Sequence, residues 1–223
     1  GDDAEPCGDA GDFGRTSTFS FSLWVKAAEH QPRTVVLHRS RAAEDSAFRG
    51  YALVLDEGRP QFSLIHFWPG NALRVRAREP IVLDTWTHVA VTYDGSSRAA
   101  GLALYVDGRP VPVDVIRDQL TRDVRHRGEW GDADAGNVKL ALGARFRDVG
   151  FRGGAVDELS IYDVALTARE VRRIAGAESA AEPDEATFFA HYLARHDAES
   201  QRIRDELAAL RQEEDALVGQ VRQ

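Results

Sequence analysis

The sequence predicts an all-β fold, an antiparallel two-sheet jelly-roll sandwich, with a C-terminal α-helical extension. Three observations predict it: short apolar runs with a period of two between residues 17 and 165, turn residues between these runs, and a helical apolar period from residue 184 onward. A period of two is typical of half-buried strands, and a period of three to four is typical of helices. We therefore expect a sandwich over residues 1–177 and an amphipathic, coiled-coil-like helix over 183–223.

The first predicted strand shows the alternation most clearly. In residues 18–25, Phe19, Phe21, Leu23 and Val25 share one face, and the serines and Trp24 lie on the other. Similar runs occupy residues 34–38, 51–55, 61–67, 72–75, 87–93, 102–106 and 138–142. About eight or nine strands is the number expected of a jelly roll.

Turn residues join these runs. Asp94-Gly95 and Asp107-Gly108 lie between predicted strands, and Gly58 follows an acidic pair in the same way. Glycine supplies the positive φ that a tight hairpin requires. No strand–helix alternation or glycine-rich phosphate loop is present, which argues against a nucleotide-binding α/β fold.

Two helical segments follow the predicted strands. Thr167 stands three residues before Glu170, which predicts a capping box for a helix that ends near Gly176. From residue 184 a second helical pattern carries an apolar stripe with spacings of four and three, and Glu214 takes one apolar position; its members are Ile203, Leu207, Leu210, Leu217 and Val221. Such a stripe is expected to bury its apolar side chains against another surface. The sandwich, another copy and other domains of the parent chain are open alternatives.

The charge of the chain is concentrated at its ends. The formal net charge is −8, yet residues 13–177 hold 20 acidic and 23 basic residues. The total disfavours nucleic acid as a partner, whereas the body stays open to neutral or acidic ligands. One cysteine excludes an intrachain disulfide, and no apolar run is long enough for a membrane span. The absence of methionine and of any leader predicts a part of a longer protein.

Several motifs resemble a known family. WTHVAVTYDG at 86–95, LYVDGRP at 104–110, GGAVDELSIYD at 153–163 and ALT at 165–167 resemble laminin G-like, concanavalin A-like jelly rolls over about residues 13–175. GDF at 11–13, IHFWPGN at 65–71 and RFRD at 145–148 resemble the copy found in large extracytoplasmic bacterial proteins that also carry cytochrome c-like domains. The resemblance implies an extracytoplasmic location, in the periplasm or at the cell surface, although this chain carries no signal.

The resemblance also implies a structural calcium ion. It suggests Asp157 as the side-chain ligand, with Asp12 as a neighbour, because calcium prefers hard oxygen donors from several segments. The alternative is that Asp157 accepts backbone hydrogen bonds in a turn. The residues themselves offer a weaker candidate at Asp132, Asp134 and Asn137. No organic cofactor is expected.

The same residues argue against an enzyme. A retaining glycosidase requires two carboxylates about 5–5.5 Å apart. In a strand the adjacent Asp157 and Glu158 point to opposite faces. No Gly-x-Ser-x-Gly motif and no helical His-x-x-x-His pair is present.

A binding site is predicted around residues 66–71. There Trp68 can stack on a sugar ring from a loop tip, and His66 and Asn71 offer hydrogen bonds; the alternative is that Trp68 caps the edge of the core. By the subgroup resemblance a second segment joins this surface, formed by Arg145, Arg147 and Asp148. Its arginines suit the carboxylates of an acidic glycan.

The predicted function is that of a non-catalytic recognition module of a larger protein, which binds carbohydrate or a protein partner. The first alternative is a structural or assembly domain whose helix organises the parent protein. A remote alternative is a glycoside hydrolase or lyase.

Overall fold

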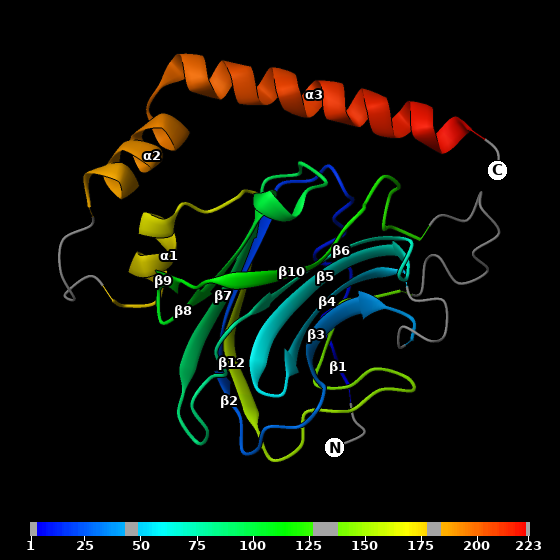
Figure 1. The fold of residues 1–223 in the computed structure, drawn as a ribbon, viewed down its shortest axis with the longest axis vertical. Coiled ribbons are helices and arrows are strands. Elements are labelled where there is room, and N and C mark those ends of the chain that lie inside the picture. The colour runs from blue at the N-terminus through cyan, green and yellow to red at the C-terminus, as the bar shows by residue number, and fades with distance from the viewer. Residues whose placement is uncertain (1–3, 43–48, 127–137, 178–183, 222–223) are drawn as a thin grey trace.

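Alternating apolar residues form two antiparallel sheets that pack face to face, in a computed structural model that describes residues 4–42, 49–126, 138–177 and 184–221 (Figure 1). In spatial order the first, seven-stranded sheet consists of β1 (Glu5–Pro6), β11 (Ala141–Leu142), β3 (Thr34–Ser40), β4 (Gly50–Asp56), β5 (Arg59–Phe67), β6 (Asn71–Ala77) and β10 (Val113–Asp118). The second, five-stranded sheet consists of β12 (Ala155–Tyr162), β2 (Phe19–Lys26), β7 (Thr87–Tyr93), β8 (Leu102–Val106) and β9 (Arg109–Pro110). The predicted all-β sandwich with C-terminal helices is confirmed.

The core lies between the sheets and receives the inward residues of each strand. Phe19 and Phe21 of β2 are fully buried against Tyr51 and Phe62 of the opposite sheet, with ring centroids 5.3 to 6.1 Å apart. Aromatic pairs at such separations stabilise a core beyond the area they bury. The predicted alternation in β2 therefore gives the observed inner face.

The predicted hairpin turns adopt left-handed backbone. Glu57 and Gly58 join β4 to β5 with φ of 51° and 79°, and Asp107 and Gly108 join β8 to β9 with φ of 48° and 74°. Two consecutive residues at positive φ give the turn whose twist matches that of paired strands.

The outer face of each sheet also carries an apolar cluster. On the five-stranded sheet, Ala90 and Tyr105 are buried beneath Leu166 and Val171, which belong to α1 (Ala168–Ile174) and the segment before it. The predicted capping box is present in both directions, between Thr167 and Glu170. On the seven-stranded sheet the outer cluster consists of Val35, Ala52, Val54, Ile65 and Ala72.

The helical extension is two helices rather than one. The helix α2 (Glu185–Arg195) ends at His196, and Asp197 begins α3 (Ala198–Gln220) by accepting a hydrogen bond from the Ser200 amide at 2.8 Å. An aspartate at this position satisfies an amide that the new helix leaves unpaired. Figure 1 shows α2 and α3 as an arm that crosses one end of the sandwich. Among the described residues, no helix has both the length and the apolar composition needed to cross a membrane.

Candidate functional site

A groove of about 520 Å³ lies on the outer face of the seven-stranded sheet. Arginines dominate its polar lining, which holds one carboxylate; the lining residues are Pro32, Arg33, Asp56, Gln61, Arg74, Arg76, Ile116 and Val149. Its volume is that of an ordinary small-ligand site. We call this feature the arginine groove.

The period of two places the central arginines there. Leu73 and Val75 of β6 face the core, so Arg74 and Arg76 face outward beside Gln61, the cross-strand partner of Arg76. The outer apolar cluster lies on the same face, because Val54 pairs with Gln61 in the register of β4 and β5. The groove therefore lies on the same face as this cluster, and its own apolar lining consists of Pro32, Ile116 and Val149.

Arg76 has unused hydrogen-bonding capacity in this groove. Its Nη1 donates to Oδ2 of Asp56 at 2.6 Å, whereas its Nε is buried without a hydrogen-bond partner among the described residues. Buried polar atoms usually have partners, so an orphaned guanidinium nitrogen at a groove indicates a place where an acceptor can bind. A guanidinium can grip a carboxylate through two of its nitrogens.

Trp68, predicted as a sugar-stacking residue, borders the groove through Arg74. The guanidinium carbon of Arg74 lies 3.7 Å from the indole centroid, and that of Arg117 lies 5.6 Å away. The half-buried indole also packs against the outer apolar cluster, and its peptide bond to Pro69 is cis. Trp68 therefore fixes the arginines at this end of the groove by cation–π contact.

The second predicted segment borders the groove through Arg33. Asp148 has a fully buried side chain and accepts from Arg33 Nε at 2.6 Å and from Arg145 Nε at 2.8 Å. Arg145 is also buried, and its Nη1 donates to Ser40 at 3.3 Å, whereas Arg147 is exposed at a positive φ of 59°. The predicted residues Arg145 and Asp148 thus hold Arg33 in place.

A buried histidine beside this ion pair is expected to make stability depend on pH. His38 Nε2 lies 2.8 Å from the carbonyl oxygen of Ala144, so Nε2 donates, and Nδ1 lies 3.2 Å from Ser40 Oγ. Burial, reinforced by the Arg145 cation, lowers the pKa of His38 from 6.5 to about 4. The folded state therefore keeps His38 neutral between pH 6.5 and 4, where the unfolded chain binds a proton.

Stability is present above pH 6.5 and is lost as the pH falls towards 4, by about 3 kcal/mol for this shift. Urea unfolding across this range measures the loss. Carboxylates also titrate there, so the informative quantity is the difference between the wild type and His38→Asn. Parallel pH profiles of the two proteins would contradict the prediction.

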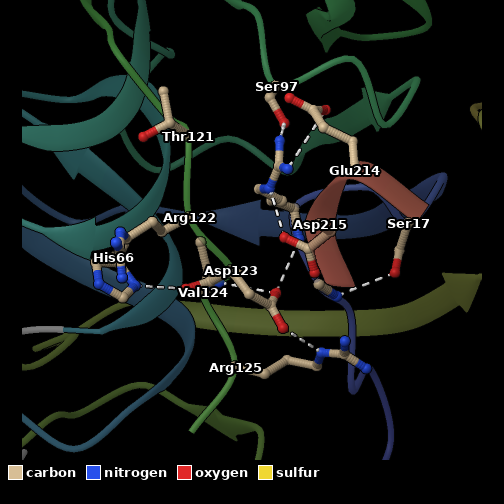
Figure 2. Close-up of polar contacts among 12 residues, drawn as sticks. Ser17, His66, Ser97, Thr121, Arg122, Asp123, Val124, Arg125, Glu214 and Asp215 are labelled. Carbon is tan, nitrogen blue, oxygen red and sulfur yellow. Dashed lines mark hydrogen bonds and ion pairs between the residues drawn. The ribbon is translucent and has the colours of Figure 1, made fainter. Parts of the chain in front are cut away.

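His66 and Asn71, the other predicted ligand residues, contact the segment at 121–123. His66 Nδ1 donates to the Asp123 carbonyl at 2.7 Å (Figure 2). Burial lowers the pKa of His66. Asn71 Nδ2 donates to Thr121 Oγ1 at 2.7 Å, and its Oδ1 accepts from the Thr121 amide at 3.0 Å. These contacts hold the chain after β10 against the end of β5 and the start of β6.

The two predicted calcium ligands contact different parts of the fold. Asp157 is exposed on β12 of the five-stranded sheet, and its Oδ1 accepts from the Glu158 amide at 2.8 Å. Asp12 pairs with Arg39 of the seven-stranded sheet, at 3.1 Å. No cluster of three or more His, Cys, Asp and Glu side chains suited to a metal occurs in the described part of the chain. Asp157 thus makes a backbone contact of the kind that the alternative describes, and the calcium site stays a prediction.

The structure bears on two further expectations about acidic residues. Asp132, Asp134 and Asn137 lie outside the described residues. The register of β12 against β2 shifts between Asp157 and Ser160, and Glu158 has a φ of 51°. This bulge interrupts the strand, so strict alternation between opposite faces does not hold for Asp157 and Glu158.

Comparison with known proteins places this geometry in a family. The family model described as the concanavalin A-like lectin/glucanases superfamily matches residues 1–172. Pentraxin-related protein PTX3 of Bos taurus is 29% identical over 167 residues, which cover 74% of this chain. The chain spans only 40% of the length of that curated relative.

Two solved structures show the same fold at low sequence identity. The CBM40 domain of the Ruminococcus gnavus IT-sialidase, bound to α2,3-sialyllactose, matches with a TM-score of 0.53 and 14% identity over 72% of this chain and 84% of that one. The binding domain of botulinum neurotoxin serotype G matches with a TM-score of 0.51 and 12% identity over 79% of this chain and 40% of that one. The family match over most of the sequence and the shared fold lead to one conclusion: this chain belongs to the concanavalin A-like lectin/glucanase superfamily.

Proposed function

We propose that the chain is a non-catalytic recognition module that binds a glycan bearing a carboxylate in the arginine groove. The observation that carries the proposal is the orphaned Nε of Arg76, in a groove whose lining has three arginines and one aspartate. A carboxylate would accept from this nitrogen and from a neighbouring guanidinium, and such charge-assisted bonds are strong. The rest of a sugar would contact the apolar residues Ile116 and Val149.

The comparisons support this choice of ligand. The family is one of lectins and glucanases, and the R. gnavus domain with the same fold was solved with an acidic trisaccharide. In this chain, groove arginines could provide the complementary charge. The pairing of Arg33 with Asp148 and the stacking of Arg74 on Trp68 fix two of these cations before a ligand arrives. Such preorganisation lowers the entropic cost of binding.

The proposal assigns no chemistry to this site. Asp56, the one carboxylate among the described residues that line the groove, is engaged by Arg76, so these residues offer no second acid for glycoside hydrolysis. The finer predictions stay part of the proposal: membership of the subgroup with cytochrome c-like domains, and an extracytoplasmic location. A structural calcium ion also stays a prediction, which needs donors beyond the pair Asp157 and Asp12 and is tested by thermal unfolding with calcium and with chelator.

Calorimetry with 3′-sialyllactose and lactose tests the proposal, because the two ligands differ by the acidic sugar. We expect binding of sialyllactose and none of lactose. Hydrogen bonds to charged groups contribute about 1.5–3 kcal/mol, so Arg76→Ala is expected to weaken binding by about tenfold or more. Arg76→Lys keeps the charge but lacks the planar fork, and should fall between wild type and Arg76→Ala.

The matched control is Arg109→Ala, which removes an exposed arginine from the edge of the other sheet. It should bind like the wild type. Equal binding of sialyllactose and lactose, or equal affinity of Arg76→Ala and Arg109→Ala, would overturn the assignment of the groove.

A further inference from the structure

The helix α3 docks on the sandwich through polar side chains. Asp215 Oδ1 accepts from Arg15 Nε at 2.6 Å, and Arg211 Nη1 donates to the Asp94 carbonyl at 2.9 Å. Asp215 is the one buried residue of α3 among those described. The contact therefore uses a polar face of the helix.

This docking leaves the apolar stripe of α3 in water. Its members are exposed by 43% to 63%; they are Ile203, Leu207, Leu210 and Leu217, with Val221 directly after the helix. Exposing a continuous apolar stripe to water is unfavourable, so such a stripe usually packs against another surface. Because α3 contacts the sandwich through a different face, the sandwich of the same chain does not cover the stripe.

The spacing of the stripe is that of a coiled-coil seam. Leu207 occupies an a position and Ile203, Leu210 and Leu217 occupy d positions of successive heptads. The other a positions hold Ser200, Glu214 and Val221. This period of 3.5 residues is maintained over nearly three heptads. The stripe therefore fits a second helix packed along its length.

The charges beside the seam specify which helix fits. Glu199, Glu206 and Glu213 occupy g positions, and Arg204 and Arg211 occupy e positions. In a parallel pair each g residue faces the e residue five positions later on the partner, which sets glutamate against arginine at 199 and 204 and at 206 and 211. An antiparallel pair would set glutamate against glutamate. The e and g charges of the helix are thus complementary to those of a second copy in the parallel orientation and not in the antiparallel one.

We propose that α3 pairs with α3 of a second copy in a parallel two-stranded coiled coil. At 3.6 residues per turn, Asp215 lies roughly 100° around the helix from the stripe. Each sandwich then lies beside the pair, next to Arg211 and Glu214, and leaves the apolar residues of the seam uncovered. Glu214, at its a position, lies 3.4 Å from Arg15 Nη2, which offsets its charge. Ser200 and Glu214 are thus the two polar a residues of the seam, and polar residues at a positions set register at some cost in stability.

Pairing would give the assembly two arginine grooves. Two sites on one particle bind a multivalent surface more tightly than either site alone, because the second contact is intramolecular. The proposal does not depend on the ligand of the groove, since mass and crosslinking measure it without any ligand.

Sedimentation equilibrium of the chain at high micromolar concentration tests the pairing. We expect twice the chain mass of 24.6 kDa. The variant Leu207→Glu with Leu210→Glu should sediment as a monomer. The matched control, Ala209→Glu with Gln212→Glu, adds the same charge on the exposed far side of α3 and should remain a dimer. Circular dichroism of the sandwich verifies that each variant is folded.

A disulfide crosslink tests the orientation. Ser200 occupies an a position near the start of α3, and its role at the helix cap is carried by its backbone amide. In a Cys7→Ser background, Ser200→Cys should form a disulfide-linked dimer on oxidation, because identical a positions adjoin in a parallel pair. In an antiparallel pair these positions lie at opposite ends. A monomeric wild type, a dimer that survives the Leu207 and Leu210 substitutions, or no crosslink would overturn the proposal.

Discussion

Replacing Asp148 with asparagine is expected to lower the free energy of unfolding by about 3–5 kcal/mol, the cost of breaking a buried ion pair by removing one partner. The Asp148 side chain is fully buried, and Arg145 beside it is 1% exposed. Asparagine keeps the shape and removes the charge that compensates two guanidinium groups. Because Asp148 also positions Arg33 in the groove, we expect weaker binding of sialyllactose as well.

Urea unfolding measures the first effect and calorimetry the second. Asp114→Asn is the matched control, because Asp114 pairs with Arg78 at 3.0 Å in a largely exposed bridge. Exposed bridges contribute about 0–1 kcal/mol. If the free energy of unfolding falls by the same small amount in both variants, the ion pairs of Asp148 with Arg33 and Arg145 do not stabilise the groove as described.

Replacing Arg15 with alanine is expected to release α3 from the sandwich. Arg15 is 3% exposed and connects α3 to Ser97 through its side chain and to Asp123 through its backbone amide. Its loss would leave Asp215 buried without this partner, at a cost of the same order, about 3–5 kcal/mol. Since α3 lies at the end of the sandwich, the helix can instead swing into water and rehydrate Asp215.

Hydrogen exchange distinguishes this outcome from global unfolding. We expect the amides of α3 to lose protection while those of β2 and β7 keep theirs. Arg202→Ala, which removes an exposed ion pair with Glu206, is the matched control. It should leave the amide protection of α3 and of the strands unchanged. Unchanged protection of α3 in the Arg15→Ala variant would contradict the docking described above.

The sequence predicts most strands because their inner faces are continuously apolar. The strand β10 is missed since it lies at the edge of its sheet and none of its six residues is buried, so it shows no clear alternation. The break between α2 and α3 is also missed, because the cap at Asp197 looks like any exposed polar residue of a helix.

For the arginine groove, the sequence predicts residues at its borders and misses those at its centre. In the sequence, Trp68 stands out as an aromatic residue next to Pro-Gly, and Arg145 and Asp148 stand out as a charged turn. In the structure Trp68 contacts Arg74, and Asp148 binds Arg33. Arg74 and Arg76 are missed because arginines at alternate positions of a strand usually face solvent. The spacing of Arg74 and Arg76 indicates that they share a face of the strand. The groove on that face, however, is formed by residues far apart in the sequence, so this spacing alone does not predict it.

A crystal structure of the chain with 3′-sialyllactose would locate the acidic sugar. We expect the ligand on the outer face of the seven-stranded sheet, with its carboxylate within hydrogen-bonding distance of Arg76 Nε. A ligand bound on the five-stranded sheet or on the helices, or a groove left empty at saturating ligand, would contradict this expectation.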